Sequence, residues 1–388
     1  MTSPQGPRWR IGMVAHAELG GSGAVAVELA SALAARGHEV HFITPGQPFR
    51  TLDDSVTVHV VNATSHEMFQ TPPWTLALAS RIAHVAERHD LELLHAHFGL
   101  PYAVATELAT QLLGAEAPPW VATLHGSDVL PLGLEPDYRP LLKLALGRAN
   151  AVTAPSDHLR RQIQLLLAPD LDVAVVPNFV DDARFRPAAG RPLPSEGPPV
   201  LVHASNFRPV KRVDDVVSVF AKVRAERAAR LLLVGEGPLR EGALARLEAL
   251  GLSGDVEAPG ARPDVERWLS RGHVALLPSE RESFGLAALE SMACGVPVVG
   301  SRVGGLPEVV PPSAGDLSPV GDVDAMAASV LAMLADDEAW RSACTKALET
   351  AQTFSPQRAV DGYLTTYQRL VVSDATTYEG DLTPRSSP

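Results

Sequence analysis

Short apolar runs alternate with longer amphipathic segments along nearly all of the 388 residues, and this alternation constrains the fold most. The runs are rich in aliphatic and β-branched residues and have the length of buried strands, whereas the segments between them have the length of helices. Such alternation is typical of β-α units stacked around parallel sheets. A chain of this length fits two domains of about 170 to 190 residues better than one core. We therefore predict an α/β protein with two doubly wound, Rossmann-like domains.

The runs and segments define the expected elements. In the first half, strands are expected at residues 10–15, 39–43, 91–97, 121–125, 151–155 and 173–177, and helices at 24–36, 75–89, 102–113, 140–148 and 157–167. In the second half, strands are expected at 200–204, 230–234, 256–259, 274–278 and 298–300, and helices at 213–227, 239–250, 265–271, 284–294, 323–335, 338–353 and 356–370. Ligands of doubly wound sheets bind at the carboxyl ends of the strands, so we expect the functional residues there, in a cleft between the domains.

A segment rich in proline and glycine, residues 187–199, separates the two halves and lacks the periodicity of a helix or a strand. We place an N-terminal domain at 1–185 and a C-terminal domain at 186–355. A helix at 356–372 carries Tyr363 and Tyr367 and is expected to pack back near the N-terminal domain. Residues 373–388 are polar and expected to be disordered.

Composition excludes several classes of function. The net charge of −12 argues against a nucleic-acid partner, and no run approaches the roughly 20 apolar residues of a membrane span. The first ten residues contain no apolar signal-peptide core. Two cysteines, Cys294 and Cys344, form neither a disulfide framework nor a metal-ligand spacing, and the thirteen histidines are scattered. We therefore expect a cytoplasmic protein with no membrane partner and no metal site.

Two carboxylates, Glu282 and Glu290, lie on either side of an expected strand-to-helix junction. The first turn of that helix is expected to contain Phe284, Gly285 and Leu286, whose unpaired N–H groups favour phosphate binding. Carboxylates accept hydrogen bonds from sugar hydroxyls, so the pair together with the helix start suggests a nucleotide sugar. Taken alone, the pattern equally fits a surface-loop Glu282 and an ordinary helical Glu290.

A cationic segment follows the first expected strand of the second half. It contains Arg208, Lys211 and Arg212. The planar guanidinium of Arg208 can bind two phosphate oxygens, and Lys211 can act as a point charge beside them. A solvated position remains the alternative for Arg212.

The first strand of the chain ends in a glycine-rich turn, residues 20–23 (GGSG), that opens into a helix and allows close backbone approach to an anion. The spacing differs from the dinucleotide fingerprint, and the next strand ends at 42–46 (FITPG) without an acidic residue to hold a ribose. A nicotinamide-dependent oxidoreductase is therefore disfavoured.

His125 ends another expected strand and precedes Gly126 and Asp128. At this position the imidazole can exchange hydrogen bonds with a sugar hydroxyl. The alternative is a structural turn in which Gly126 supplies the backbone angle and Asp128 caps the next segment.

Together these motifs resemble the retaining glycosyltransferases of family 4, which have the GT-B fold of two Rossmann-like domains facing an interdomain cleft. Arg208, Lys211, Glu282, Glu290 and residues 293–299 (ACGVPVV) carry the resemblance, which covers residues 10 to 370. Within the family, the chain is most similar to members of the bacillithiol pathway. That finer likeness rests on residues 20–23, 41–44, 48–50, 72–73, 76–80, 125–128 and above all 205–212 (SNFRPVKR).

The resemblance implies transfer of N-acetylglucosamine from UDP-N-acetylglucosamine to the hydroxyl of L-malate with retention of configuration. It implies that Arg208 and Lys211 bind the diphosphate with backbone amides of Gly21, Phe284, Gly285 and Leu286. Glu290 would hold the ribose, the backbone around Arg262 would contact uracil, and Glu282 and His125 would hold the donor sugar. His125, Glu282, Arg208 and Lys211 would thus be the catalytic residues. No metal or other cofactor is implied, because the leaving diphosphate itself assists removal of the acceptor proton.

The same resemblance places L-malate against Ser22, Thr123, Asn206 and Arg208, and against Phe98, where the family is expected to carry a tyrosine. The alternatives are the same donor with another acceptor, such as an inositol phosphate or a glycan, and a UDP-N-acetylglucosamine epimerase on the same fold. A nucleotide-sugar-binding protein without transfer activity is a further alternative. The expected partners are small molecules, with a homodimer as a candidate assembly.

Overall fold

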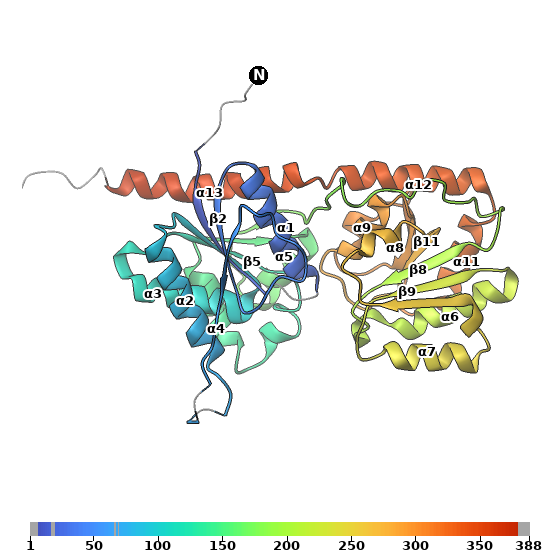
Figure 1. Ribbon diagram of the computed structural model, residues 1–388, viewed down its shortest axis with the longest axis horizontal. Coiled ribbons are helices and arrows are strands. Elements are labelled where there is room, and N and C mark those ends of the chain that lie inside the picture. Colours follow the sequence, from blue (N-terminus) through green and yellow to red (C-terminus); the bar gives the residue numbers. More distant parts are fainter. Residues whose placement is uncertain (1–6, 17–19, 66, 69, 379–388) are drawn as a thin grey trace, which may run out of the picture. The chain divides into compact units, whose positions relative to one another are not determined.

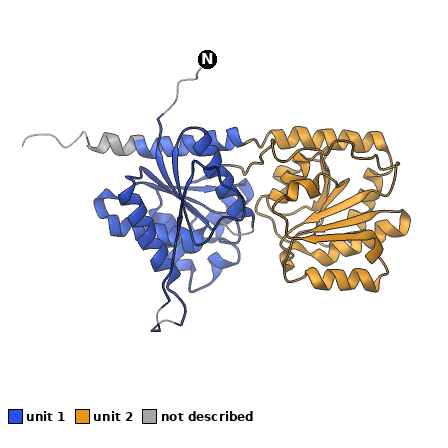
Figure 2. Cartoon of the chain, in the orientation of Figure 1, with its two compact units in different colours: residues 1–176, 356–388 blue, residues 177–355 orange. Residues whose placement is uncertain are grey.

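The computed structural model describes residues 7–16, 20–65, 67–68 and 70–378, and side chains as far as residue 371. The chain divides into two compact units (Figure 2). Unit 1 comprises Met1–Val176 and Pro356–Pro388, and unit 2 comprises Pro177–Ser355. Each unit contains a parallel sheet with helices on both faces, so the predicted α/β architecture is confirmed (Figure 1).

The sheet of unit 1 has seven parallel strands in the order β3-β2-β1-β4-β5-β6-β7. Its strands are β1 (Arg10–Val14), β2 (Glu39–Thr44), β3 (Thr57–Val60), β4 (Leu93–His97), β5 (Trp120–Thr123), β6 (Ala151–Ala154) and β7 (Val173–Val175). Its helices are α1 (Gly21–Ala35), α2 (Trp74–Arg88), α3 (Val104–Leu113), α4 (Arg139–Arg148), α5 (Asp157–Leu166) and α13 (Pro356–Tyr378). One continuous core joins this sheet to α2, α3, α4 and α5, while α1 packs against α13.

The sheet of unit 2 has six parallel strands in the order β10-β9-β8-β11-β12-β13. Its strands are β8 (Val200–Ala204), β9 (Arg230–Val234), β10 (Val256–Gly260), β11 (Val274–Leu277), β12 (Val298–Ser301) and β13 (Gly315–Ser318). Its helices are α6 (Val213–Glu226), α7 (Arg240–Ala249), α8 (Val265–Leu269), α9 (Leu286–Ala293), α10 (Leu306–Val309), α11 (Val323–Met333) and α12 (Asp337–Gln352). Apolar cores line both faces of the sheet, one against α9 and the other against α6 and α11.

The division between the units falls at Val176/Pro177, whereas the sequence analysis placed the boundary after residue 185. Val180 and Phe185 explain the difference, because both are buried in the core of unit 2. The second division, at 355/356, coincides with the start of the last helix, which belongs to unit 1.

That helix, α13, continues to Tyr378 and so includes residues expected to be disordered, while residues 379–388 lie outside the described part of the chain. Residues 1–6 also lie outside it. Within the described residues, no helix has the length and hydropathy required to cross a bilayer.

Three elements were not predicted: β3, β13 and α10. Strand β3 (TVHV) is a partly exposed edge strand, and β13 (GDLS) begins with a glycine, so neither shows the apolar run of the inner strands. Gly315 is required in β13 because a Cβ atom there would lie 2.1 Å from the carbonyl oxygen of Val298 on the neighbouring strand.

Candidate functional site

Two loops of unit 2 meet at the carboxyl ends of β8 and β11, which are neighbouring strands of the sheet. The Nζ atom of Lys211 lies 2.6 Å from Oε1 of Glu282, and the Ser279 hydroxyl donates to the same oxygen at 2.9 Å. A backbone hydrogen bond from Glu280 N–H to the Val210 carbonyl, 2.8 Å long, joins the two loops directly. The structure therefore brings together the cationic segment and the first glutamate that the sequence analysis singled out.

Hydrogen bonds and close backbone contacts, in addition to apolar packing, hold the loop after β8 in place. Phe207 is fully buried with a positive φ of 44°, and its N–H donates to the Ser205 hydroxyl at 3.1 Å. Gly235 and Gly237 pack against this loop so closely that a Cβ atom on either would lie 1.8 Å from a loop carbonyl oxygen. The two glycines after β9 therefore allow the loop that carries Arg208 and Lys211 to pack directly against them.

The His203 side chain connects the same loop to the neighbouring strand through two hydrogen bonds. Its Nδ1 lies 2.8 Å from the Leu276 carbonyl, which only accepts, so Nδ1 carries the proton and Nε2 accepts from the Ser205 hydroxyl at 2.8 Å. Burial, together with the nearby Lys211 ammonium, lowers the pKa of His203 to about 4. The neutral imidazole therefore acts as a fixed hydrogen-bond relay between β11 and the loop.

The three cations of the loop differ in their surroundings. Arg208 is exposed and has no ion-pair partner among the described residues. Lys211 is paired with Glu282, and Arg212 is paired with Asp215 at 2.6 Å in a left-handed conformation that begins α6. Arg212 therefore has a structural role, whereas Lys211 contacts the glutamate of the neighbouring loop and Arg208 is exposed to solvent. Asn206, in the same loop, has a buried Oδ1 that finds no hydrogen-bond partner in the described part of the chain.

The helix predicted to begin at Phe284 begins instead at Leu286. Gly285 adopts a left-handed conformation with φ 106°, which interrupts the helical path, and Phe284 is buried with its ring 5.7 Å from that of Phe354. No side chain caps α9, and among the described residues the N–H groups of Phe284, Gly285 and Leu286 donate to no acceptor. The predicted row of unpaired amides is therefore present at this helix start, although two of its residues precede the helix.

The segment after β12 fixes the position of Glu282. Gly305 N–H donates to the Glu282 carbonyl at 3.0 Å, and a Cβ atom on Gly304 would lie 1.7 Å from that same oxygen. The Leu306 side chain covers Gly285. The second glutamate, Glu290, is 8% exposed and lies on α9, and its charge helps to raise the pKa of the Cys294 thiol to about 12 after burial itself.

Arg262 is exposed beyond the end of β10. Its guanidinium lies 3.3 Å from Asp264 and over the Trp268 ring at 5.4 Å. The Arg262 side chain is therefore already engaged with its neighbours along the chain.

In unit 1, the glycine-rich turn places Gly21 as the first residue of α1. The Ser22 hydroxyl lies 2.7 Å from Nε2 of His16, and the His16 ring meets Phe98 edge-on at 6.0 Å. Phe98 has a positive φ of 86°, which directs the chain away from the end of β4. The sequence analysis missed His16, and its position two residues beyond the first strand was the available signal.

Thr123, expected at the acceptor, lies inside the unit instead. It is fully buried, and its hydroxyl is 2.6 Å from both His95 Nε2 and the Thr153 hydroxyl. His95 Nδ1 in turn lies 2.6 Å from the Tyr367 hydroxyl of α13. Because Thr123 and Tyr367 are both fully buried, the Thr123 hydroxyl belongs to a closed polar network and is not available to a substrate.

His125 is 9% exposed, and its Nε2 lies 3.1 Å from Nδ1 of His97. Burial lowers the pKa of His125 to about 3 and lowers the pKa of His97 well below its ordinary value, so both rings are neutral at physiological pH. Asp128 accepts from the N–H groups of Gly99, His125 and Gly126 at 2.7 to 3.0 Å. The turn alternative therefore holds for Asp128, and the same turn fixes the position of His125.

Comparison with known proteins connects the chain that carries these candidate residues to a family. A model of Glycosyltransferase Family 4 matches residues 19–184, and a model of glycosyl transferases group 1 matches residues 198–336. The N-acetyl-alpha-D-glucosaminyl L-malate synthase of Bacillus anthracis is 40% identical over 374 residues, which span 94% of this chain and 98% of the relative. The chain belongs to glycosyltransferase family 4.

Two further comparisons place this family 4 glycosyltransferase among its relatives. A D-inositol 3-phosphate glycosyltransferase of Thermomonospora curvata is 31% identical over 395 residues and 90% of each chain. Among solved structures, sucrose-phosphate synthase from Thermosynechococcus elongatus is similar with a TM-score of 0.79 at 22% identity, covering 94% of this chain and 100% of that one. The predicted GT-B fold is thereby confirmed.

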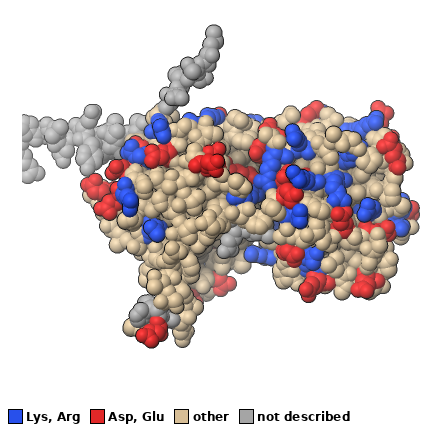
Figure 3. Space-filling view, in the orientation of Figure 1, with Lys and Arg blue, Asp and Glu red and all other residues tan. Residues whose placement is uncertain are grey.

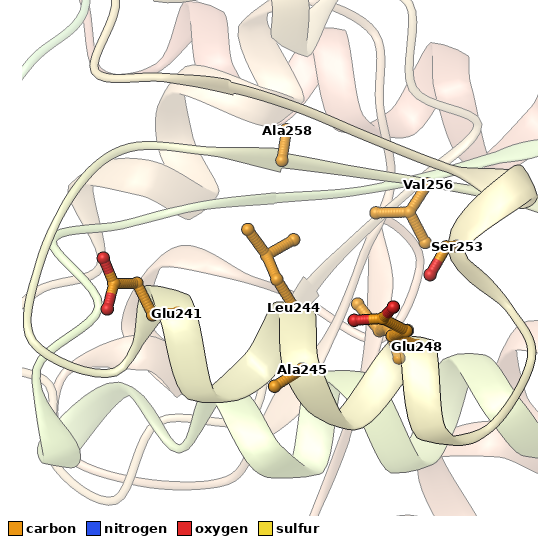
Figure 4. A pocket seen from close by; sticks show the side chains of 8 residues that line it. Glu241, Leu244, Ala245, Glu248, Ser253, Val256 and Ala258 are labelled. Carbon is orange, nitrogen blue, oxygen red and sulfur yellow. The ribbon is translucent and has the colours of Figure 1, made fainter.

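Two surface features away from these candidate residues do not fit a nucleotide. A pocket of about 400 Å³ lies between α7 and β10, where Leu244 and Val256 are flanked by the carboxylates of Glu241 and Glu248 (Figure 4). Its acidic rim is unsuited to a diphosphate, and no site residue described above lines it. On the face drawn in Figure 3, basic side chains gather over unit 2 and are interspersed with acidic ones.

The structure also brings together three histidines that the sequence analysis treated as scattered: His41, His59 and His89. They come from β2, from β3 and from the residue that follows α2. The expectation of no metal site rested on sequence spacing, which did not reveal this group.

Proposed function

We propose that this family 4 glycosyltransferase transfers N-acetylglucosamine from UDP-N-acetylglucosamine to the hydroxyl of L-malate, with retention of configuration, as the first step of bacillithiol biosynthesis. The observation that carries the acceptor is the 40% identity, over 98% of its length, to the Bacillus anthracis enzyme named for glucosaminyl-malate synthesis. The inositol-phosphate relative is more distant at 31% identity. The site residues of unit 2 support the donor.

The donor diphosphate is proposed to bind at the carboxyl ends of β8 and β11. Arg208, exposed and without an ion-pair partner among the described residues, and Lys211 supply the cations. The N–H groups of Phe284, Gly285 and Leu286 supply neutral donors at the positive end of α9. The N–H of Gly21 at the start of α1 is proposed as a further donor in unit 1.

Separate groups are assigned to the rest of the donor. Glu290, on the second turn of α9, is proposed to accept from the ribose hydroxyls, and the backbone near Arg262 to contact uracil. Glu282 is proposed to accept from the sugar hydroxyls, its carboxylate being held in place by Lys211 and Ser279. His125 contributes a neutral imidazole to the sugar, since burial lowers its pKa to about 3.

In the transfer step the malate hydroxyl oxygen forms the new bond to C1 of the sugar on the face from which UDP departs. The bond from C1 to the phosphate oxygen breaks, its electron pair passes to UDP, and the leaving phosphate takes the hydroxyl proton. Arg208 and Lys211 stabilise the negative charge that develops on the diphosphate, and electrostatic stabilisation of this kind supplies most of the rate enhancement in many enzymes. This arrangement needs no metal at the phosphates, and we propose none.

The acceptor carboxylates require hydrogen-bond donors. Asn206 and Arg208 of unit 2, and Ser22 of unit 1, are the proposed donors, with Phe98 forming an apolar wall beside His16. The proposed location is the cytoplasm, whose reducing conditions keep thiols such as those of Cys294 and Cys344 free, as both are here. A homodimer remains the candidate assembly.

The test is release of UDP from UDP-N-acetylglucosamine with L-malate, with an inositol phosphate, with a small glycan, and without an acceptor. We expect release only with malate, together with a product of retained α-configuration by NMR. Release that requires inositol phosphate would assign the alternative acceptor. Release without any acceptor would identify an epimerase-like or hydrolytic activity and contradict the proposal.

A further inference from the structure

Three histidines of unit 1, His41, His59 and His89, direct ring nitrogens to one point. One nitrogen from each lies within 4.8 Å of the other two. Nδ1 of His41 lies 2.9 Å from Nε2 of His59, and the His89 ring centroid lies 4.3 Å from that of His41. His41 is buried and the other two are half-buried, so the group is open to solvent on one side.

A carboxylate fixes the tautomer of the innermost ring. Oε1 of Glu39 lies 3.1 Å from Nε2 of His41. An ionised carboxylate only accepts hydrogen bonds, so Nε2 of neutral His41 carries the proton and its lone pair is on Nδ1, facing His59. Metal-binding histidines commonly donate their second N–H to a carboxylate in this way, which both orients the ring and increases its basicity.

We propose that His41, His59 and His89 bind the divalent transition-metal ion Zn²⁺, with a water molecule as the fourth ligand. Zn²⁺ accepts imidazole nitrogens at about 2.0 to 2.1 Å in a tetrahedron, whose ligand atoms lie about 3.3 Å apart. Nδ1 of His41 and Nε2 of His59 are 2.9 Å apart, slightly closer than in such a tetrahedron, and the His89 nitrogen lies within 4.8 Å of both. Small side-chain rotations, above all of His89, which ends a helix, would complete the site. The site goes beyond the transfer reaction and does not depend on it.

The position of the site indicates a structural role. His41 and His59 lie on adjacent strands, β3 is the edge strand of the sheet, and His89 is the residue that ends α2. Ser22 and His125, which are assigned to the reaction, follow the carboxyl ends of β1 and β5. His89, in contrast, precedes β4, and the chain runs from it into the amino end of that strand, which is the opposite end of the sheet. The ion would link the edge strand β3 to β2 and to the end of α2.

Several charged or titratable side chains surround the three histidines and affect how well they would bind a cation. Arg81 and Arg88 of α2 add positive charge close to His59, and His84 lies close to His89. Glu39 is the carboxylate in contact with the group. Its replacement should therefore weaken binding through His41 without removing a ligand.

The test is zinc binding to the full-length protein after treatment with a chelator, measured by competition with a chromophoric chelator and by metal analysis after dialysis. We expect one Zn²⁺ per chain. His59→Ala and His89→Ala should each lower the affinity at least 10-fold, and Glu39→Gln should lower it by about 10-fold or more. His84→Ala, which removes a nearby exposed histidine outside the group, is the matched control and should bind as the parent does.

Two further readouts separate a site from loss of fold. Zn²⁺ should raise the melting temperature of the parent and of His84→Ala, and slow amide exchange in β2 and β3, but do neither in His89→Ala. His89 ends a helix and is half-buried, so that variant should keep the parent's circular dichroism spectrum. UDP release by the chelator-treated enzyme should equal that of the zinc-loaded enzyme. Absence of binding to the parent, or binding that the His59 and His89 variants leave unchanged, overturns the proposal.

Discussion

Lys211 and Glu282 form the contact on which the candidate donor site depends, and each is held by a different part of the sheet. Lys211 follows β8 and Glu282 follows β11, and their side chains are 23% and 10% exposed. Glu282 keeps a second partner, Ser279, when Lys211 is removed. The lysine can therefore be replaced without leaving a buried carboxylate unpartnered, which makes it the better residue for a functional test.

Lys211→Ala should lower kcat/KM for UDP-N-acetylglucosamine by at least about 100-fold, because a cation near the leaving phosphate acts mainly in the transition state. The melting temperature should change by no more than a few degrees, since the pair is partly exposed. Steady-state kinetics and thermal unfolding measure the two effects. The matched control is Lys222→Ala, which breaks an exposed pair with Asp324. Equal activity in both variants would contradict the assignment.

The start of helix α9 offers hydrogen-bond donors to a ligand. Its first turn has free N–H groups because Gly285, in a left-handed conformation, offers no capping side chain. Leu306 of α10 covers the same glycine, so the start of α9 and the segment after β12 are fixed together. The orientation of Glu282, bonded through its carbonyl to Gly305, depends on this contact.

Gly285→Ala should therefore destabilise unit 2 and impair catalysis together. The left-handed conformation costs a non-glycine residue about 1 to 2 kcal/mol, and the new Cβ would lie 2.5 Å from Leu306 Cδ1. The matched control is Gly242→Ala in α7, where nothing lies within 4 Å and helix propensity favours alanine by about 1 kcal/mol. Thermal unfolding should show opposite signs for the two variants. A Gly285→Ala variant as stable as the parent would contradict this account.

The inner strands could be predicted from sequence because their apolar runs are continuous: β8 and β9 begin and end at the predicted residues. The cationic loop and Glu282 were singled out because each follows a strand, and Glu290 because it lies on the helix that comes next. What failed depended on tertiary contacts. Thr123 ends a strand as a site residue should, but a helix 244 residues further along the chain, carrying Tyr367, covers it by way of His95. His41, His59 and His89 meet only after three elements have packed.

At the scale of the molecule, both units contain buried neutral histidines. Burial lowers the pKa of His95 and His125 in unit 1 to about 3, and the pKa of His203 and His273 in unit 2 to about 4. Their folded-state pKa values lie below the ordinary value of 6.5, so the unfolded chain binds more protons once the pH falls below about 6.5. Stability is complete above that pH and is lost as the pH falls from there towards 4.

We therefore expect the free energy of unfolding to fall between pH 7 and pH 5, by about 2 kcal/mol for each such histidine at pH 5. Thermal or urea unfolding at several pH values measures this dependence. His203→Gln removes one of the groups and should reduce the slope for unit 2. A melting temperature that stays constant from pH 7 to pH 5 would contradict the prediction.

The hydrogen bond between His95 and Tyr367 has a consequence for how the chain is made. Unit 1 is built from a segment that precedes unit 2 in the chain and a segment that follows it, whereas unit 2 is one continuous segment between them. The polar network of His95, Thr123 and Thr153 therefore lacks its cover until α13 has been synthesised. The first segment of unit 1 is thus translated before unit 2 but can complete its packing only after unit 2 has been translated.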